Sequence, residues 1–500
     1  MTSWWITTLP PIPGAVRAVF YGGLLVLCLI DHPSPLDAPK LVARTAPEFY
    51  TPVAVLRILG LEHVRPPVLT IVRWATIVCW VAAAAGFGQP VAGLLTFVGF
   101  AFLHAVNAGA LGANHSTHAA LFALLSLSFC VSHDTLSLDT YLADRFGWSL
   151  LLGQDSVLAS GFAALLLMVF VAYIMFAGGV AKLRYGGRAW LSGRSLRFYI
   201  TQSLAFARAP RIAGAVAGSA ALCRILAWLT VAIELAAPLI LLLPGQRNIF
   251  VLAWICLHIG ILLVMMPAYW VQMWCYMLLM SWAALPGVLL HSDSYVAAPG
   301  LGAHVLAAVG TAICVVLLIA LLRQSEQWPF TSVPMYSNGL VPEQFDLPRP
   351  EQLTERARLA ARGELCSWHR PWVPAESLDD IEIVPADSGP AISLFDAVSA
   401  HDTPFVRWSQ FAKVVREVAI DDLSAKPPDR PDDDAPGYPG NRFLTGVLPF
   451  VRQSLPDWQR YSHLQLACLT TTGWFPIATA DLADARRSTT TSDAKGRETP

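Results

Sequence analysis

Apolar segments recur through the first two thirds of this chain, at lengths that approach the thickness of a membrane. A helix that crosses a bilayer needs about 20 predominantly apolar residues. Nine segments come close to this, near 17–31, 69–86, 91–110, 117–132, 158–180, 221–243, 248–266, 269–290 and 302–323. One of them is short and two are separated only around Pro267, so eight to ten spans are expected. The pattern predicts an all-α polytopic membrane bundle, followed by a small α+β soluble region.

Charge is scarce in this chain and unevenly distributed along it. Charged residues make up 14% of the sequence and the mean hydropathy is +0.51, whereas soluble proteins carry about 25% charged residues. Residues 1–323 have a net charge of +7, and residues 324–500 have a net charge of −8. We therefore expect a transmembrane domain over 1–340 and a soluble C-terminal region over 341–482.

The region after the last apolar segment divides further by composition. Residues 427–440 are rich in proline, glycine and aspartate, which predicts a linker. Residues 483–500 are rich in serine, threonine and charged residues, which predicts a disordered tail. The acidic region is a candidate surface for a protein partner. Nucleic acid is not an expected partner, because the basic groups lie between apolar segments and form no stripe beside aromatic residues.

Loop charges predict how the bundle is oriented. Residues 181–219 hold seven Lys or Arg and no acidic residue, whereas residues 133–155 hold four Asp against one Arg. Basic loops remain in the cytoplasm, so 181–219 should lie inside and 133–155 outside. Counting spans from there places the C-terminus in the cytoplasm and the protein in the plasma (inner) membrane. Alternatively, the basic run serves anionic lipid headgroups.

Lys182 closes a long apolar run that begins at Gly161. An ammonium group at the edge of a hydrocarbon span is costly to desolvate, so its presence needs a reason. Removal from water favours the neutral amine, and a neutral amine can act as a base. The alternative is a lysine whose stem lies along the helix end while its charge reaches the headgroups.

A second polar cluster contains His104, Asn107, Asn114, His115 and His118. On one continuous helix, with 3.6 residues per turn, the three histidines would share a face with the two asparagines beside them. Such a face inside a membrane should line a polar cavity. Two alternatives remain: glycines in the segment could break the helix, or the imidazoles could bind a metal. No carboxylate or cysteine lies close by in sequence to complete a metal site, so no metal is expected.

Glu234 and His258 lie deep inside two further apolar segments. A buried carboxyl group could pair with Lys182, with Arg224 or with a histidine, and could then hold charge or relay protons. Each residue alone could instead form a hydrogen bond between helices without any chemistry. Ionisable residues on four different apolar segments together predict a site inside the bundle.

Three short motifs resemble those of one family. The stretch Ala177–Gly193 (AGGVAKLRYGGRAWLSG) resembles a signature of the vitamin K-dependent gamma-carboxylases and of the related bacterial horizontally transferred transmembrane (HTTM) domain proteins. Asn114-His115-Ser116 is similar to the "NHS" of that family at the start of a span. Trp328–Ser337 (WPFTSVPMYS) resembles an element that often follows the last span. The resemblance covers roughly residues 45–340.

The resemblance implies a chemistry and a set of site residues. A lysine at the position of Lys182 would deprotonate a reduced naphthoquinone of the vitamin K or menaquinol type, and a histidine at His115 would support it. Oxygen and carbon dioxide would be co-substrates, and a protein or peptide could be the acceptor. The residues expected to line the quinol site are Asn114, His118, Trp190, Glu234 and His258.

Two hypotheses from different classes follow from the sequence. The first is a membrane-embedded, quinol-dependent enzyme, a carboxylase or quinol epoxidase, whose partners are membrane lipids and the quinol. The second is a non-enzymatic integral membrane protein that binds lipid, acts as a scaffold or assists transport. In the second case the polar residues are packing contacts, and the acidic C-terminal region carries the function.

Overall fold

The computed structural model describes most of residues 12–331 and shorter parts of 358–482. Outside the described residues lie 1–11, 13, 31–33, 45–49, 51, 90, 112–116, 129–135, 149–155, 205–206, 266–268, 281–300, most of 324–377, 388, most of 395–443, 445–447, 449–450, 453–454, 471–472 and 483–500. Asn114, His115, the predicted linker and the predicted tail are therefore outside the described part of the chain.

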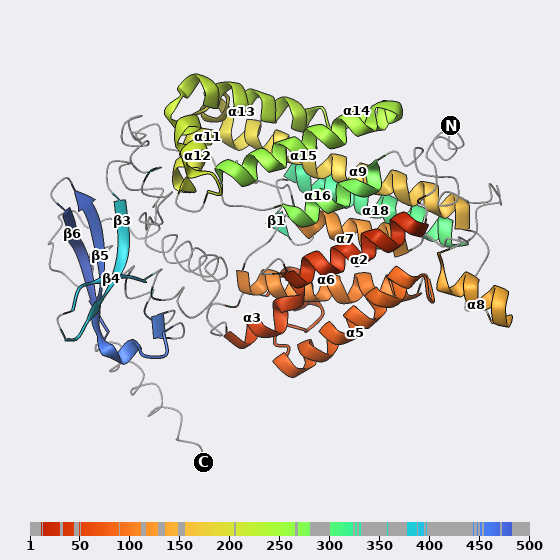
Figure 1. Ribbon diagram of the computed structural model, residues 1–500, viewed down its shortest axis with the longest axis horizontal. Coiled ribbons are helices and arrows are strands. Elements are labelled where there is room, and N and C mark those ends of the chain that lie inside the picture. The colour runs from red at the N-terminus through yellow and green to blue at the C-terminus, as the bar shows by residue number, and fades with distance from the viewer. Residues whose placement is uncertain are drawn as a thin grey trace, which may run out of the picture.

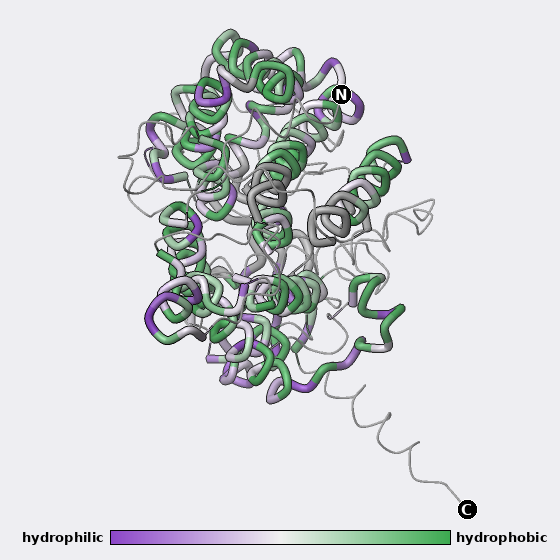
Figure 2. The backbone as a smooth tube through the Cα atoms, turned by 90° about the vertical axis from the view of Figure 1, so that its right-hand side faces the viewer, coloured by the Kyte–Doolittle hydropathy of each residue, from purple (hydrophilic) through white to green (hydrophobic). Residues whose placement is uncertain are grey.

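Long apolar helices dominate the described residues (Figure 1). The longer helices are α2 (Gly14–Ile30), α5 (Pro66–Ala85), α6 (Val91–Leu111), α7 (His118–Ser128), α9 (Ser156–Ala181), α13 (Ala220–Leu235), α15 (Arg247–Val264) and α18 (Leu301–Arg323). The shorter helices are α3 (Ala38–Arg44), α4 (Ala54–Ile58), α8 (Leu138–Phe146), α10 (Gly187–Leu191), α11 (Arg194–Gln202), α12 (Pro210–Gly218), α14 (Leu239–Leu242) and α16 (Trp270–Tyr276). Hydrophobic residues prevail along most of these helices (Figure 2).

Several of these helices have the length and composition to cross a membrane. Within the described residues there are four, Pro66–Ala85, Val91–Ala110, Ala164–Leu191 and Arg247–Val264, or up to six if each of two bent helix pairs is one span. Large apolar side chains on their outer faces are exposed, including Ile71 on α5 and Leu252 on α15. Such faces suit hydrocarbon, as a multi-pass membrane protein requires. The count of eight to ten spans stays a prediction.

Helix α2 is held by two tryptophans from distant segments. Trp80 on α5 donates its Nε1–H to the carbonyl of Tyr21 at 2.9 Å. Trp274 on α16 donates to the carbonyl of Phe20 at 3.0 Å. A Cβ added at Gly23 would overlap the Trp274 ring, so only glycine lets the indole lie against α2. These contacts join segments 59 and 254 residues apart.

The described C-terminal residues form a small antiparallel sheet. Its strands are β3 (Leu378–Pro385), β4 (Ile392–Ser393), β5 (Tyr461–Thr470) and β6 (Gly473–Asp481), in the order β4-β3-β5-β6. Ile383 on β3 is paired with Leu464 on β5, and both side chains are fully buried. A two-stranded ladder, β1 (Glu326–Gln327) with β2 (Phe330–Thr331), follows α18. The sheet lies beside the end of the bundle where α11 and α12 are found (Figure 1). Strands are thus present where the sequence predicted an α+β region.

Candidate functional site

Two adjacent glycines let α13 approach the end of α9 closely. A Cβ added at Gly179 would lie 3.0 Å from Cβ of Glu234, tighter than an ordinary contact. A Cβ added at Gly178 would lie 3.6 Å from both Oε1 of Glu234 and Nζ of Lys182. Small residues of this kind are common where membrane helices pack closely. They place the Glu234 carboxyl group directly against the last turn of α9.

The chain changes its helical geometry at Lys182. Residues Lys182–Gly186 form a π-helix between α9 and α10. Such widened turns are uncommon and are often found at functional sites. The segment then turns through Gly187, at φ 46°, into α10, which carries Trp190 back over the lysine. A continuous α-helix would change the direction of the Trp190 side chain relative to Lys182.

Gly193 joins α10 to α11 and touches the backbone of α13. Its φ of 80° lies in the left-handed region that favours glycine. A Cβ added there would be 2.5 Å from the Arg224 nitrogen and 2.7 Å from the Cys223 carbonyl carbon. The glycines of the 177–193 motif therefore have a local structural reason, because they allow α9, α10 and α11 to close around one place on α13.

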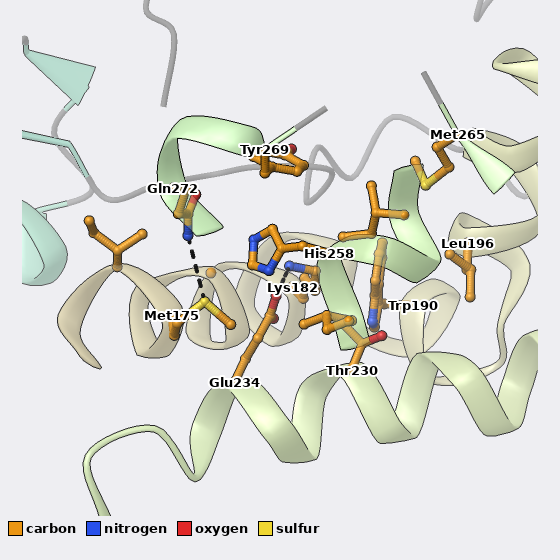
Figure 3. Close-up of a pocket in the computed structure, with 14 residues that line it drawn as sticks. Met175, Lys182, Trp190, Leu196, Thr230, Glu234, His258, Met265, Tyr269 and Gln272 are labelled. Carbon is orange, nitrogen blue, oxygen red and sulfur yellow. Dashed lines mark hydrogen bonds and ion pairs between the residues drawn. The ribbon is translucent and has the colours of Figure 1, made fainter. Parts of the chain in front are cut away.

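Lys182 and Glu234 form a buried ion pair at this place. Nζ of Lys182 lies 2.8 Å from Oε1 of Glu234, and the two residues are 4% and 7% exposed. The ammonium group also lies 5.4 Å from the centre of the Trp190 ring, a cation–π distance. Figure 3 shows the two charged side chains meeting from the π-helix after α9 and from α13, with His258 beside them. Of the three partners considered for Glu234, the structure shows Lys182.

Several polar atoms around the pair have no hydrogen-bond partner among the described residues. They are Oε2 of Glu234, Nε1 of Trp190 and Oε1 of Gln272. All three side chains are at least nine-tenths buried and line one cavity. Buried polar groups normally find a partner, in the protein or in ordered water. Two acceptors and one donor thus converge on a space where a polar ligand or water would satisfy them.

His258 also lines the cavity. Its Nδ1–H donates to the carbonyl of Trp254 at 2.7 Å, because a carbonyl oxygen can only accept. The ring packs edge-on against Tyr269 at 4.9 Å and Tyr276 at 5.6 Å between ring centres. Tyr276 in turn accepts a hydrogen bond from Nε2 of Gln272 at 2.8 Å. The hydrogen bond of Nδ1 and the two aromatic contacts fix the orientation of the imidazole, and Nε2 is its remaining ring nitrogen.

The cavity between these side chains is small. Its volume is about 40 Å³, which is room for roughly three water molecules at about 10–15 Å³ each. Apolar side chains complete its walls, among them Ile174, Leu196, Leu257, Ile261 and Met265. Gln272, Tyr269 and Thr230 also line it and were not anticipated from sequence, although a glutamine within the predicted span 269–290 is a signal that could have identified one of them.

The histidine cluster predicted at 104–118 lies elsewhere. On one straight helix, His104 and His118 would lie about 21 Å apart along the axis, but their rings are in contact between α6 (ending at Leu111) and α7 (beginning at His118), so they do not share one helix face. His104 and His118 nevertheless pack together, with 5.4 Å between ring centres, and His104 is hydrogen-bonded to Thr117. None of these residues lines the cavity at Lys182. The two helices bring the imidazoles together by packing, and not by sharing one face.

Asn107 is also part of this separate cluster. Its Nδ2 donates to the carbonyl of Ser34 at 2.8 Å, which ties α6 to the short turn before α3. His115 and Asn114 lie outside the described residues, so the expected pairing of Lys182 with His115 stays a prediction. Within the described part of the chain, no group of three or more His, Cys, Asp or Glu could hold a metal ion.

Comparisons with known proteins do not add to this picture. No family model matches the chain, and neither a curated protein nor a solved structure does. The resemblance of 177–193 to the gamma-carboxylase-related family therefore stays a prediction from sequence.

Proposed function

We propose that this chain is a multi-pass membrane enzyme whose Lys182–Glu234 pair takes a proton from the hydroxyl group of a quinol. The observation that carries the proposal is the pair itself: a cation and an anion 2.8 Å apart, deep among apolar helices, beside unpartnered polar atoms. Buried pairs of this kind are costly to desolvate, and ionisable residues inside membrane domains commonly serve function.

Glu234 and Lys182 have different roles in this proposal. Oε2 of Glu234 faces the cavity without a partner and can accept a proton from an incoming hydroxyl group. The Lys182 ammonium group then stabilises the negative charge left on the ligand oxygen. Alternatively, a proton moves along the 2.8 Å hydrogen bond and leaves a neutral amine as the base. His258, through Nε2, is placed to receive the proton next.

The residues fit the polar end of such a ligand. A reduced naphthoquinone would supply an acidic hydroxyl group and the oxygen-dependent chemistry that the family resemblance implies. Glu234, Lys182 and Trp190 offer the acceptor and donors that a phenolic oxygen requires. A volume of about 40 Å³ does not admit a bicyclic ring, so binding requires side chains at the rim to move. Leu257 and Ile261 of α15 and Thr230 of α13 are half-buried there.

A non-enzymatic role is favoured by one observation. The ion pair joins α9 to α13 across the closely packed glycines, and the cavity beside it is small. A structural clamp has these properties as well. Under that alternative the chain binds lipid or organises partners, and loss of the pair affects folding without any loss of turnover per folded molecule.

The test is quinol turnover by purified protein in lipid. Wild-type protein is incubated with reduced naphthoquinone, oxygen and bicarbonate, and the quinone products are separated and quantified. Lys182→Met should abolish the oxygen-dependent product. Lys40→Met, which removes an exposed lysine on α3, is the matched control and should keep full activity.

Folding is checked separately for each variant by gel filtration and thermal unfolding. The double variant Lys182→Met with Glu234→Gln leaves no unpaired buried charge, so it should remain folded and inactive. Turnover in this folded double variant, or none in the wild type with any isoprenoid naphthoquinol, would overturn the proposal and favour the non-enzymatic role.

A further inference from the structure

The segment after Lys182 is arranged as a layer across one end of the bundle. α12 and α13 meet at a bend of 101°. If α13 crosses the membrane, α12 must lie nearly parallel to the membrane surface. α11 and α12 pack on each other and on the end of α15 through a small apolar core that contains Ile200, Ala213 and Met265. The backbone nitrogen of Ala209 also donates to the carbonyl of Leu263 at 2.9 Å.

This surface layer, defined as residues 183–224, is strongly basic. No acidic residue occurs between Ala181 and Ile233. Arginines are exposed on three helices and on the segment before one of them: Arg188 on α10, Arg208 before α12, Arg211 on α12 and Arg224 on α13. The layer itself therefore supplies no acidic side chain to neutralise these arginines.

Exposed apolar side chains lie among these arginines. Leu183 is 37% exposed, Ile212 is 53% exposed and Ile225 is 63% exposed. Ile212 directly follows Arg211, and Ile225 directly follows Arg224. A helix in the plane of a membrane surface presents basic groups to lipid phosphates and apolar groups to the acyl boundary. An acidic peptide would satisfy the charges but would leave these apolar side chains in water.

We propose that the surface layer binds the phosphate groups of anionic phospholipids, with Arg208 and Arg211 of the α12 region as its principal contacts. With α13 across the membrane, the 101° bend at Ser219 would bring α12 to headgroup depth, and the exposed Arg188 and Arg224 extend the same basic surface. The inference concerns the surface of the layer and does not depend on the chemistry proposed for the cavity. It gives the basic run of 181–219 a ligand as well as an orientation.

The layer also forms part of the cavity wall. Trp190 on α10 and Leu196 on α11 line the cavity from within, while arginines of the same two helices face outward or toward α12. Nε of Arg197 donates to the carbonyl of Ala217 at 2.7 Å, which fixes α11 to the last turn of α12. A lipid bound at α12 therefore contacts the same rigid unit that covers the Lys182–Glu234 pair.

The test measures lipid preference of the full-length protein in nanodiscs. Discs are made with equal amounts of phosphatidylglycerol and phosphatidylcholine, and the lipids retained after delipidation are counted by mass spectrometry. Wild-type protein should retain phosphatidylglycerol preferentially. Each arginine near a membrane surface is worth about a fivefold change in partition. Arg208→Gln with Arg211→Gln should therefore lower the preference at least fivefold.

Two further variants control for net charge and folding. Arg57→Gln with Arg145→Gln removes the same charge from exposed positions on α4 and α8, and this variant should keep the preference for phosphatidylglycerol. Arg208→Lys with Arg211→Lys retains the charge and should also keep it. The proposal would be overturned if wild-type protein retained both lipids equally. It would also be overturned if the α4 and α8 variant lost as much preference for phosphatidylglycerol as the Arg208→Gln, Arg211→Gln variant.

Free phosphate is distinguished in a separate arm. Thermal unfolding is followed in phosphatidylcholine discs with inorganic phosphate added to the buffer, and in discs that contain phosphatidylglycerol. A rise in Tm with the lipid alone is expected. An equal rise with inorganic phosphate would assign the site to the free ion and would refute the lipid assignment.

Discussion

Replacing Gly193 with alanine tests how the segment after Lys182 is held against α13. The residue has φ 80°, and a left-handed conformation costs an L-residue about 1–2 kcal/mol. The new methyl group would also lie 2.5 Å from the Arg224 nitrogen. Backbone cannot rotate away as a side chain can, and overpacking of this kind costs about 1–3 kcal/mol. The expected loss in the free energy of unfolding is therefore about 2–5 kcal/mol.

Gly147→Ala is the matched control. Gly147 has φ 66°, at the end of α8, but nothing lies within 4 Å of an added Cβ. That variant should lose only the conformational part, about 1–2 kcal/mol. Both variants are unfolded reversibly in detergent, and the midpoints are compared at constant slope, because a changed slope would signal a changed end state. Equal losses at Gly193 and Gly147 would refute the close approach of α11 to α13.

Three other predictions follow from contacts described above. Gly23→Ala should lower the free energy of unfolding by about 1–3 kcal/mol, because its methyl group meets the indole ring of Trp274. Gly22→Ala has open space around the new methyl group and should not lower it, so the unfolding midpoints of the two variants test the prediction. Lys182→Met should lower the free energy of unfolding by about 3–5 kcal/mol, because it leaves a buried carboxyl group without its cation. Adding Glu234→Gln should restore most of that stability, and a double-mutant cycle in which the two effects simply add would contradict the prediction. Burial raises the pKa of Tyr199 to about 12; the unfolded phenol ionises first, so stability should fall as the pH rises from about 10 to 12, and Tyr199→Phe should remove this part of the pH dependence.

The positions of the helices could be predicted from sequence because apolar length is a local property. α5, α6, α9 and α15 each lie within a few residues of an apolar segment. The break between α6 and α7 was considered only as an alternative, since glycine spacing alone does not state whether a helix continues. The break has a visible consequence, because it turns His104 and His118 from neighbours on one face into partners across a helix pair.

The candidate site could be predicted only in part. A buried lysine and a buried glutamate are conspicuous in apolar segments, so their involvement was foreseeable. The partner of each residue was not foreseeable, because a membrane helix that is apolar on all sides gives no periodic signal of the face it buries. Gln272 was missed for the same reason, and Trp190 depended on the π-helical turn, which no simple spacing rule describes.

The two indoles that hold α2 have a consequence for biogenesis. Trp80 is synthesised 59 residues after its acceptor, but Trp274 is synthesised 254 residues after its own. At about 5–20 residues per second, the ribosome adds Trp274 roughly 10–50 s after it has made α2. During that interval α2 lacks the Trp274 ring that packs against Gly23 in the finished bundle. Completion of the bundle is therefore a late event, and a chain released before residue 274 would leave this face of α2 open to other membrane proteins or to quality-control proteases.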